Sequence, residues 1–247
     1  MTALAHLWDL LTAPGPVLAT WLVALSAGFA LILVLSRRAW HVSRNVVTLA
    51  HEGGHAAVSI ATGRRLDGIR LHSDTSGVTS SRGKSRGAGL ILTTAAGYVT
   101  PSLLGLGAAW LLAARHATFL LWLVLLLLAA AFVAIRNAYG VLAVLATAAV
   151  VFGVSRFASV RAQELFAYLS AWFLLFGGIR PVFELAGRRR RGRALASDAD
   201  QLALLTGVPG GAWVFLFGLV SVAALVVGTA WMLPSLSHWL LAARGQQ

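Results

Sequence analysis

The sequence predicts an all-α polytopic membrane protein with about seven (six to seven) transmembrane helices and a short β-hairpin after the second of them. Of its 247 residues, 58% are hydrophobic and only 11% are charged, whereas soluble domains carry about 25% charged residues. Several apolar runs reach about 18 residues or more, the length at which a helix can cross lipid. The excess of apolar side chains therefore indicates that much of the chain faces a bilayer rather than water.

The expected helices are the apolar segments at residues 16–36, 45–62, 88–114, 117–135, 138–154, 165–183 and 211–233. The first has no basic region before it and is long enough to remain a span, so we do not expect a cleaved signal peptide. Only "RNAYG" separates the fourth and fifth segments, which predicts a tight helical hairpin. If one of these two does not cross fully, the count is six.

We expect a single domain over residues 1–247. It would comprise an N-terminal helix and linker (1–44), a core (45–220), and the end of the last helix with a tail (221–247). No cysteine is present, which excludes disulfides, thiolate metal sites and cysteine nucleophiles.

Two polar loops interrupt the apolar segments. In residues 63–87 apolar and polar side chains alternate on both sides of "SDTSG", a sequence with turn chemistry, and this predicts a short β-hairpin. Residues 187–211 begin with a basic run and continue into "SDADQLALLT". That stretch predicts a short helix capped by Ser197 or Asp198.

The net charge is +12, from 20 Lys and Arg against 8 Asp and Glu. Most of the basic residues lie in the 63–87 loop, at Arg136 and in the 184–210 loop. The positive-inside rule then places the N-terminus and both polar loops in the cytoplasm, and we expect a bacterial cytoplasmic membrane. Basic loops of this kind also contact anionic lipid. No recognition module for nucleic acid accompanies the charge, so no nucleic-acid partner is expected.

The most informative motif is His51-Glu52-x-x-His55, inside the apolar stretch "VVTLAHEGGHAAVSIATG". Residues four apart share one face of a helix, so His51 and His55 can present two imidazoles to one metal ion. In this motif the histidines bind zinc, and the glutamate is the general base for a bound water whose pKa zinc lowers to about 7. Ionisable groups in a membrane helix are costly and usually functional. We predict one zinc ion per chain; the alternative is a polar cluster that only holds helices together.

Catalytic zinc needs a third protein ligand and keeps one position for water. The extended form of the motif is absent, because Val58 and Ala61 stand where it has Gly and His. The chain has eight carboxylates as candidates: Asp9, Glu52, Asp67, Asp74, Glu164, Glu184, Asp198 and Asp200. Asp198 and Asp200 open the short helix on the hairpin side, and capping explains one of them more easily than two. Asp198 is the favoured ligand and Asp200 the alternative.

This assignment contains a conflict of depth. His55 lies about 10 Å inside its predicted helix at about 1.5 Å per residue, whereas Asp198 is expected near the membrane surface. Either the 195–210 segment dips into the bundle, or the predicted helix ends are misplaced. Irregular backbone at depth is tolerated only where protein or a water-filled cavity surrounds it.

Longer stretches make the chain similar to a known family. "HEGGHAAVSIATGRRLDGIRLHSDTSGVTSS", "AAGYVTPSLLG", "RNAYG" and "SDADQLALLTGVPGGAWVF" together resemble site-2-protease-like intramembrane zinc metallopeptidases, the B-type branch of peptidase family M50. The resemblance covers residue 45 to about 220. It implies that His51, His55 and Asp198 bind zinc and that Glu52 is the catalytic acid/base. The chain departs from the better-known members in lacking an Asn-Pro-x-x-Asp-Gly motif, which carries their third ligand.

Four residues are predicted to contact a substrate. Gly53 and Gly54 lie inside the motif, where glycine admits either a substrate strand or a neighbouring helix. His72 is either a surface residue of the hairpin or a substrate contact. Asn137 either hydrogen-bonds an oxyanion or stabilises a helix turn. The resemblance suggests in addition that the hairpin adds an extended substrate strand to its edge.

We therefore predict an intramembrane zinc endopeptidase that cuts membrane-embedded or membrane-adjacent proteins, with Glu52 as general base. Its expected partners are a membrane-protein substrate and the lipid bilayer; the sequence predicts no oligomeric state. One alternative is a transporter or ion-binding protein that uses the His/Glu cluster as a proton or metal relay. It would predict internal repeats, and none is detected. Another is a zinc-binding pseudoenzyme, against which Glu52 argues, since structural zinc sites are closed by four protein ligands.

Overall fold

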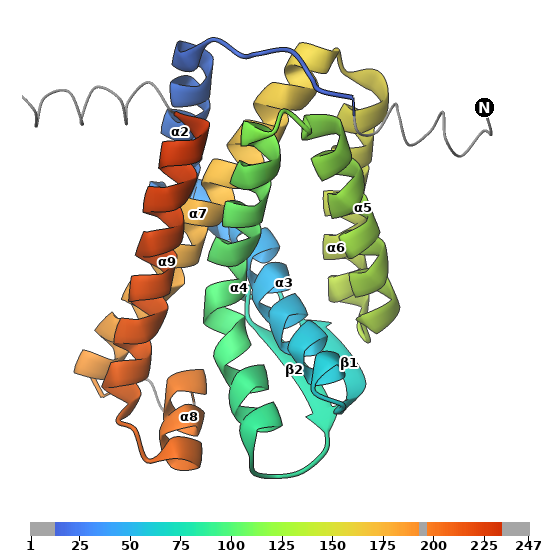
Figure 1. The fold of residues 1–247 in the computed structure, drawn as a ribbon. Helices are drawn as coiled ribbons and strands as arrows, with labels where there is room; N and C mark the ends of the chain where they lie inside the picture. The colour runs from blue at the N-terminus through green and yellow to red at the C-terminus, as the bar shows by residue number, and fades with distance from the viewer. Residues whose placement is uncertain (1–12, 193–196, 234–247) are drawn as a thin grey trace, which may run out of the picture.

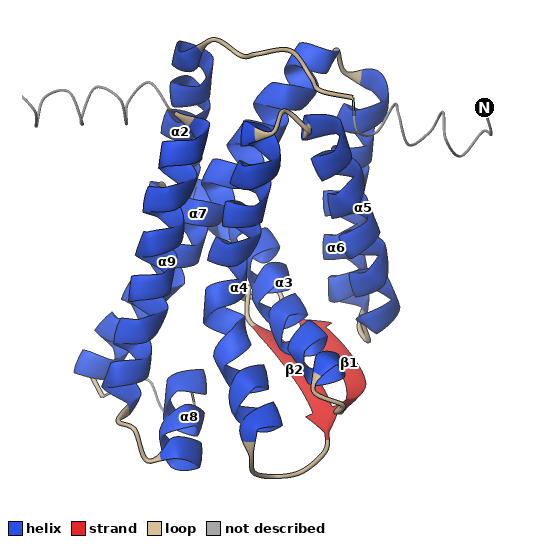
Figure 2. Ribbon diagram, viewed as in Figure 1, coloured by secondary structure: helices blue, strands red, loops and turns tan. Residues whose placement is uncertain are grey.

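The computed structural model describes residues 13–192 and 197–233, and most of this part of the chain is helical (Figures 1 and 2). In chain order the elements are α2 (Thr20–Leu35), α3 (Arg37–Ala61), β1 (Arg65–Leu71), β2 (Gly77–Arg82), α4 (Ala88–Ala113), α5 (Ala117–Ala134), α6 (Ala138–Phe157), α7 (Val160–Arg190), α8 (Asp198–Thr206) and α9 (Gly210–Met232). The expected helical polytopic fold, with one β-hairpin after the helix that carries the histidine motif, is confirmed.

Five helices are long and apolar enough to cross a membrane, namely α4, α5, α6, α7 and α9. Helices α2 and α3 add a sixth crossing if they are taken as one span that bends by 100°. The described residues therefore match the lower end of the expected range. A seventh span is not found among them, because the predicted segments 16–36 and 45–62 are the two arms of this bent pair.

The bend lies at Ser36. The backbone of Ser36 is extended (φ −67°, ψ 124°), which ends α2, and its side chain accepts a hydrogen bond from the Ala39 amide at 3.4 Å, which caps α3. Helix α3 thus begins at Arg37, well before the predicted start at residue 45. Helix α3 meets α2 at 100°, so the depth expected for His55, which was counted along a straight span, does not apply.

Helix α4 lies at the centre of the bundle, packed against α3, α7 and α9 (Figure 1). Small residues allow this close approach. A Cβ added to Gly54 of α3 would lie 2.6 Å from the Cβ of Thr100, and one added to Gly178 of α7 would lie 2.9 Å from the amide nitrogen of Ser102. Contacts of small residues are the usual means by which helices associate in lipid, where apolar burial against the bilayer gives no driving force.

The predicted hairpin has the expected turn. Strands β1 and β2 pair antiparallel, with Arg65 opposite Arg82 and Leu71 opposite Gly77. In the turn, the Asp74 carboxylate accepts a hydrogen bond from the Ser76 amide at 3.0 Å, the local pairing that makes Asp a turn residue.

The connection between α5 and α6 covers the other edge of β1. Ile135 forms a parallel bridge with Ile69. The Asn137 side chain accepts a hydrogen bond from the Leu71 amide at 3.2 Å and donates one to the Leu71 carbonyl at 2.6 Å. Among the described residues, the edge of the hairpin that stays open to another strand is therefore that of β2.

Figure 1 shows two ends of the bundle: the hairpin, the α5–α6 turn and α8 lie at one, and the α4–α5 and α6–α7 turns at the other. The chain just before α2 lies at the second end, since the Gly15 amide donates to the Arg115 carbonyl at 2.8 Å. The predicted placement of the segment before α2 on the side of the hairpin is thus wrong, because α2 and α3 together run once from one end of the bundle to the other (Figure 1). The charge bias is unaffected, as no Lys or Arg precedes Arg37.

Candidate metal centre

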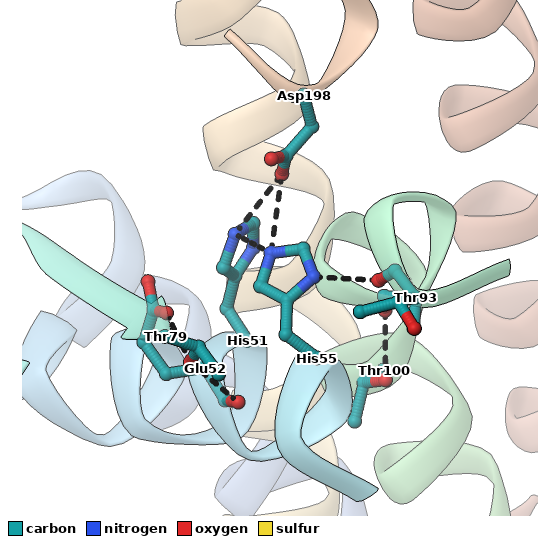
Figure 3. A network of polar contacts seen from close by, with 8 residues as sticks. His51, Glu52, His55, Thr79, Thr93, Thr100 and Asp198 are labelled. Atoms are coloured by element: carbon teal, nitrogen blue, oxygen red, sulfur yellow. Dashed lines mark hydrogen bonds and ion pairs between the residues drawn. The ribbon is translucent and has the colours of Figure 1, made fainter. Parts of the chain in front are cut away.

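Three potential ligand atoms from two helices meet at one point (Figure 3). His51 and His55 project from the same face of α3, and Asp198 is the first residue of α8. The Oδ2 atom of Asp198 lies 3.3 Å from Nε2 of each histidine, and the two Nε2 atoms are 3.1 Å apart. The structure thus brings together the predicted histidine pair and the favoured third ligand.

The donor set fits zinc. Two imidazole nitrogens and one carboxylate oxygen, with a fourth position for water, are the ligands of many catalytic zinc sites. Tetrahedral bonds of about 2.0–2.2 Å keep zinc ligands about 3.3–3.6 Å apart, close to the spacing of these three atoms. Burial opposes ionisation of Asp198, but His51 and His55 more than offset burial and hold its pKa below the usual range. In the described part of the chain no other group of three such ligands is found.

A backbone carbonyl fixes the protonation of His55. Its Nδ1 atom lies 2.7 Å from the Thr93 carbonyl of α4. A carbonyl can only accept a hydrogen bond, so Nδ1 carries a proton and Nε2 is the nitrogen left to bind a metal ion beside His51 and Asp198. Partners of this kind orient the histidines of metal sites.

Gly97 of α4 leaves space beside both imidazoles. A Cβ at this position would lie 2.6 Å from Nε2 of His51 and would press on Nε2 of His55 as well. The ring of Tyr98 meets the His51 ring edge-on, with centroids 4.8 Å apart, and stacks on Phe217 of α9. Helix α4 therefore forms one wall of the site, and that wall accepts only a glycine next to the ligand atoms.

Helix α8 is held in place by the second of its two carboxylates. One oxygen of Asp200 accepts hydrogen bonds from the Ser197 amide (3.1 Å) and hydroxyl (2.6 Å), and the other is paired with Arg189 at the end of α7. Burial raises the pKa of Asp200, but these partners outweigh burial and lower it. Asp200 is thus engaged as a cap and an ion-pair partner, whereas Asp198 faces the imidazoles.

Strand β2 holds the side chain of Glu52. Glu52 is 4% exposed, and its carboxylate accepts a hydrogen bond from the Thr79 hydroxyl at 2.6 Å (Figure 3). Gly77 lies so close that a Cβ there would be 2.7 Å from Oε1 of Glu52. The hairpin therefore folds back onto the helix that precedes it and positions the predicted general base.

The family model described as Peptidase M50B-like matches residues 24–228. The chain belongs to this family. The matched region contains α3 with its histidines, the hairpin and α8, which confirms the resemblance noted in the sequence. Neither the curated proteins nor the solved structures gave a match. Family membership and the apolar helices together indicate a membrane-embedded peptidase.

Within this M50B-like chain, the two glycines of the motif have different surroundings. Gly54 is buried against Thr100, so its lack of a side chain serves helix packing. A Cβ added to Gly53 would meet nothing within 4 Å. Of the two, Gly53 is the one that leaves room for another chain.

The other predicted substrate contacts lie in the hairpin region. His72 is exposed in the turn, where its Nδ1 is 3.3 Å from the Ser76 hydroxyl. Asn137 uses both atoms of its amide on the backbone of Leu71 in β1, and its side chain makes no capping hydrogen bond to α6. A contact of either residue with substrate stays a prediction.

Sequence reasoning missed three contributors to the site: Thr79, Thr93 and Gly97. The alternation of side chains along a strand predicts that Thr79 lies on the same face as Gly77, two residues away. In the structure this is the face toward α3. Thr93 acts through its carbonyl, which every residue type has, so no side-chain pattern points to it. The role of Gly97 depends on how α3 and α4 pack together.

Proposed function

We propose that the protein is an intramembrane zinc metalloendopeptidase that hydrolyses peptide bonds of membrane-embedded or membrane-adjacent proteins. The observation that carries the proposal is the triangle of His51, His55 and Asp198 beside a buried Glu52, in a member of the Peptidase M50B-like family. Zinc held by these three ligands would polarise the scissile carbonyl and make water a nucleophile at neutral pH.

The residues of the site then have distinct tasks. Glu52 takes a proton from the attacking water and gives it to the nitrogen of the leaving amine. Thr79 keeps the carboxylate of Glu52 in position by its hydroxyl group. Thr93 keeps His55 in the tautomer that can bind metal.

An apolar groove offers a route for a substrate from the lipid. It has a volume of about 500 Å³ and is lined by residues of α3, α4 and α9, among them Val58, Ala96 and Phe217. Ala96 precedes Gly97, so the groove adjoins the wall of the site. In a helix each peptide carbonyl accepts an intrahelical hydrogen bond, so a helical substrate must become extended before it can be cut. We propose that the open edge of β2 holds the extended stretch by strand addition.

Elemental analysis of the detergent-purified protein tests the metal site. We expect about one zinc per chain in the wild type and in Glu52→Gln, and loss of zinc in His55→Ala and Asp198→Ala. Zinc that is lost in Asp200→Ala but kept in Asp198→Ala would move the third ligand by two residues. Absence of zinc from the wild type after metal repletion would refute the site.

Labelling of protein N-termini in membranes tests the reaction. Cells that produce the wild type are compared with cells that produce Glu52→Gln, which should keep the metal and lose the general base. New termini within or next to transmembrane segments are expected only with the wild type. Identical sets of termini in the two cell populations would count against a peptidase.

A further inference from the structure

A second cavity lies at the end of the bundle opposite the metal centre. It has a volume of about 280 Å³ and is lined by residues 16–18 and the start of α2, the α4–α5 turn, the first turns of α7 and the end of α9. Unlike the apolar groove, it has both polar and apolar walls, and Glu164 and Arg115 provide its charges. No residue of the metal centre lines it, so it is a separate site.

Glu164 is a buried acceptor whose hydrogen-bonding capacity is not used. The residue is 3% exposed, and its Oε2 atom has no hydrogen-bond partner in the described part of the chain. The backbone at Gly15 lies directly over Oε1, where any side chain would strike the carboxylate. A buried carboxylate without a donor is costly. Because Glu164 also lines the cavity, a molecule bound there is the available source of a hydrogen-bond donor for this carboxylate.

Arg115 supplies a fixed positive charge on the same cavity. Its Nε and Nη2 atoms donate to the Gly15 carbonyl, with Nε at 2.8 Å, and its backbone is left-handed, with φ 64°. No ion pair joins Arg115 to Glu164 among the described residues, so the two charges do not satisfy each other. The cavity therefore offers an anion and a cation as separate binding groups.

We propose that this cavity binds the headgroup of an aminophospholipid, with the primary ammonium on Glu164 and the phosphate toward Arg115. A primary ammonium brings three N–H donors to the carboxylate oxygen that lacks one, and arginine is suited to phosphate. Pockets for drug-sized ligands measure about 300–1,000 Å³, so a cavity of about 280 Å³ suits a small headgroup. Val17, which lines the cavity and is 77% exposed, gives the acyl chains an apolar surface at its edge.

Thermal unfolding in defined lipid tests the proposal. The delipidated protein is mixed with micelles that contain phosphatidylethanolamine or phosphatidylcholine with the same acyl chains. Both headgroups are zwitterionic, but the quaternary ammonium of phosphatidylcholine has no N–H donor. We expect phosphatidylethanolamine to raise the Tm of the wild type by about 2–4 °C more than phosphatidylcholine does. Glu164→Gln, which keeps the shape but removes the charge, should lose this difference.

The matched control is Glu184→Gln, a partly buried glutamate toward the other end of α7, which should keep the preference. The zinc content of Glu164→Gln should equal that of the wild type. Equal Tm values in the two lipids, or a preference that persists in Glu164→Gln, would overturn the proposal.

Soluble phosphoethanolamine tests whether the site needs the whole lipid or only its headgroup. If it competes with phosphatidylethanolamine, the headgroup alone binds. If it does not compete, the acyl chains contribute to binding; either result supports the site.

Discussion

Gly97 contributes to the metal centre by having no side chain. A methyl group there would take up space against Nε2 of both histidines, so Gly97→Ala should separate the ligand atoms. We expect zinc affinity to fall by roughly 10- to 100-fold, the range seen when the surroundings of metal ligands are changed. Zinc titration of the metal-free protein with a competing chelator gives the measurement.

The chain offers a matched control on the same helix. A Cβ added to Gly107 of α4 would meet nothing within 4 Å, and Gly107→Ala brings the same gain in helix propensity. Unchanged zinc affinity in Gly107→Ala would assign the effect of Gly97→Ala to the contact with the histidines. Equal affinities in both variants would show that the metal does not need the space at Gly97.

Thr79 is expected to act on turnover and not on metal binding. Its hydroxyl holds the carboxylate of Glu52, and a hydrogen bond to a charged group contributes about 1.5–3 kcal/mol. Thr79→Val, which keeps the shape of the side chain, should slow cleavage by roughly 10- to 100-fold and leave zinc content unchanged. Thr79→Ser should restore most of the rate. The measurement is the rate of cleavage of a substrate found by the labelling of termini, and a Thr79→Val enzyme as fast as the wild type would contradict this role.

A residue of the site could be predicted from the sequence where its position depends only on neighbouring residues in the chain. The spacing of His51 and His55 predicts one shared face because four residues are about one helical turn, and this inference needs no tertiary contact. The small number of carboxylates points to Asp198, but from the sequence only the argument from capping favours it over Asp200. The structure gives the reason for that preference: Asp200 is already bound to Ser197 and Arg189, and their geometry depends on how α7 and α8 meet.

Helix α8 is short, and its link to the rest of the bundle should decide how tightly Asp198 can bind metal. The pairing of Arg189 with Asp200 joins α8 to the end of α7. Arg189→Gln and Asp200→Asn should therefore weaken zinc binding by roughly 10- to 100-fold although neither residue is a ligand. Asp198→Ala should abolish binding at the same zinc concentrations.

The control for this effect is Arg190→Gln. Arg190 is exposed and belongs to the same basic run, so its replacement removes an equal charge without touching α8. A loss of affinity in Arg190→Gln as large as in Arg189→Gln would point to general electrostatics instead of the position of α8. Added salt should reduce the difference between the two variants, because the ion pair is partly exposed.

Among the elements, the hairpin and the single-helix segments were predictable and the bend was not. "SDTSG" has turn chemistry of its own, and α5, α6 and α9 follow from continuous apolar runs. The break at Ser36 lies between two apolar segments, and nothing local distinguishes a loop that returns the chain across the membrane from a bend. The packing of α3 beneath α4, through Gly54 and Thr100, decides between them. This is why the sequence predicts the wrong end of the bundle for the segment before α2.

On the scale of the whole molecule, bound zinc would tie the first third of the chain to its last third. His51 and His55 lie in α3, whereas Asp198 lies in α8, so a metal that binds only the folded protein should stabilise the entire bundle. Removal of zinc with 1,10-phenanthroline should lower the Tm of the wild type by several degrees. The same treatment should leave the Tm of Asp198→Ala unchanged. A wild-type Tm that does not respond to the chelator would show that the metal does not join the two parts.

The distribution of charge predicts how the molecule sits in the membrane. The end of the bundle with the hairpin and the α7–α8 connection carries most of the Lys and Arg, and helix α4 separates it from the Arg115 end. The positive-inside rule then puts the metal-site end in the cytoplasm.

Cysteine labelling tests this orientation. Because the chain contains no cysteine, Ser73→Cys and Ala114→Cys each introduce a single thiol at an exposed position, one before α4 and one after it. In intact cells a membrane-impermeant maleimide should label Ala114→Cys, and Ser73→Cys should react only after permeabilisation. The reverse pattern would invert the orientation and keep the fold, whereas labelling of both from one side would contradict a crossing by α4.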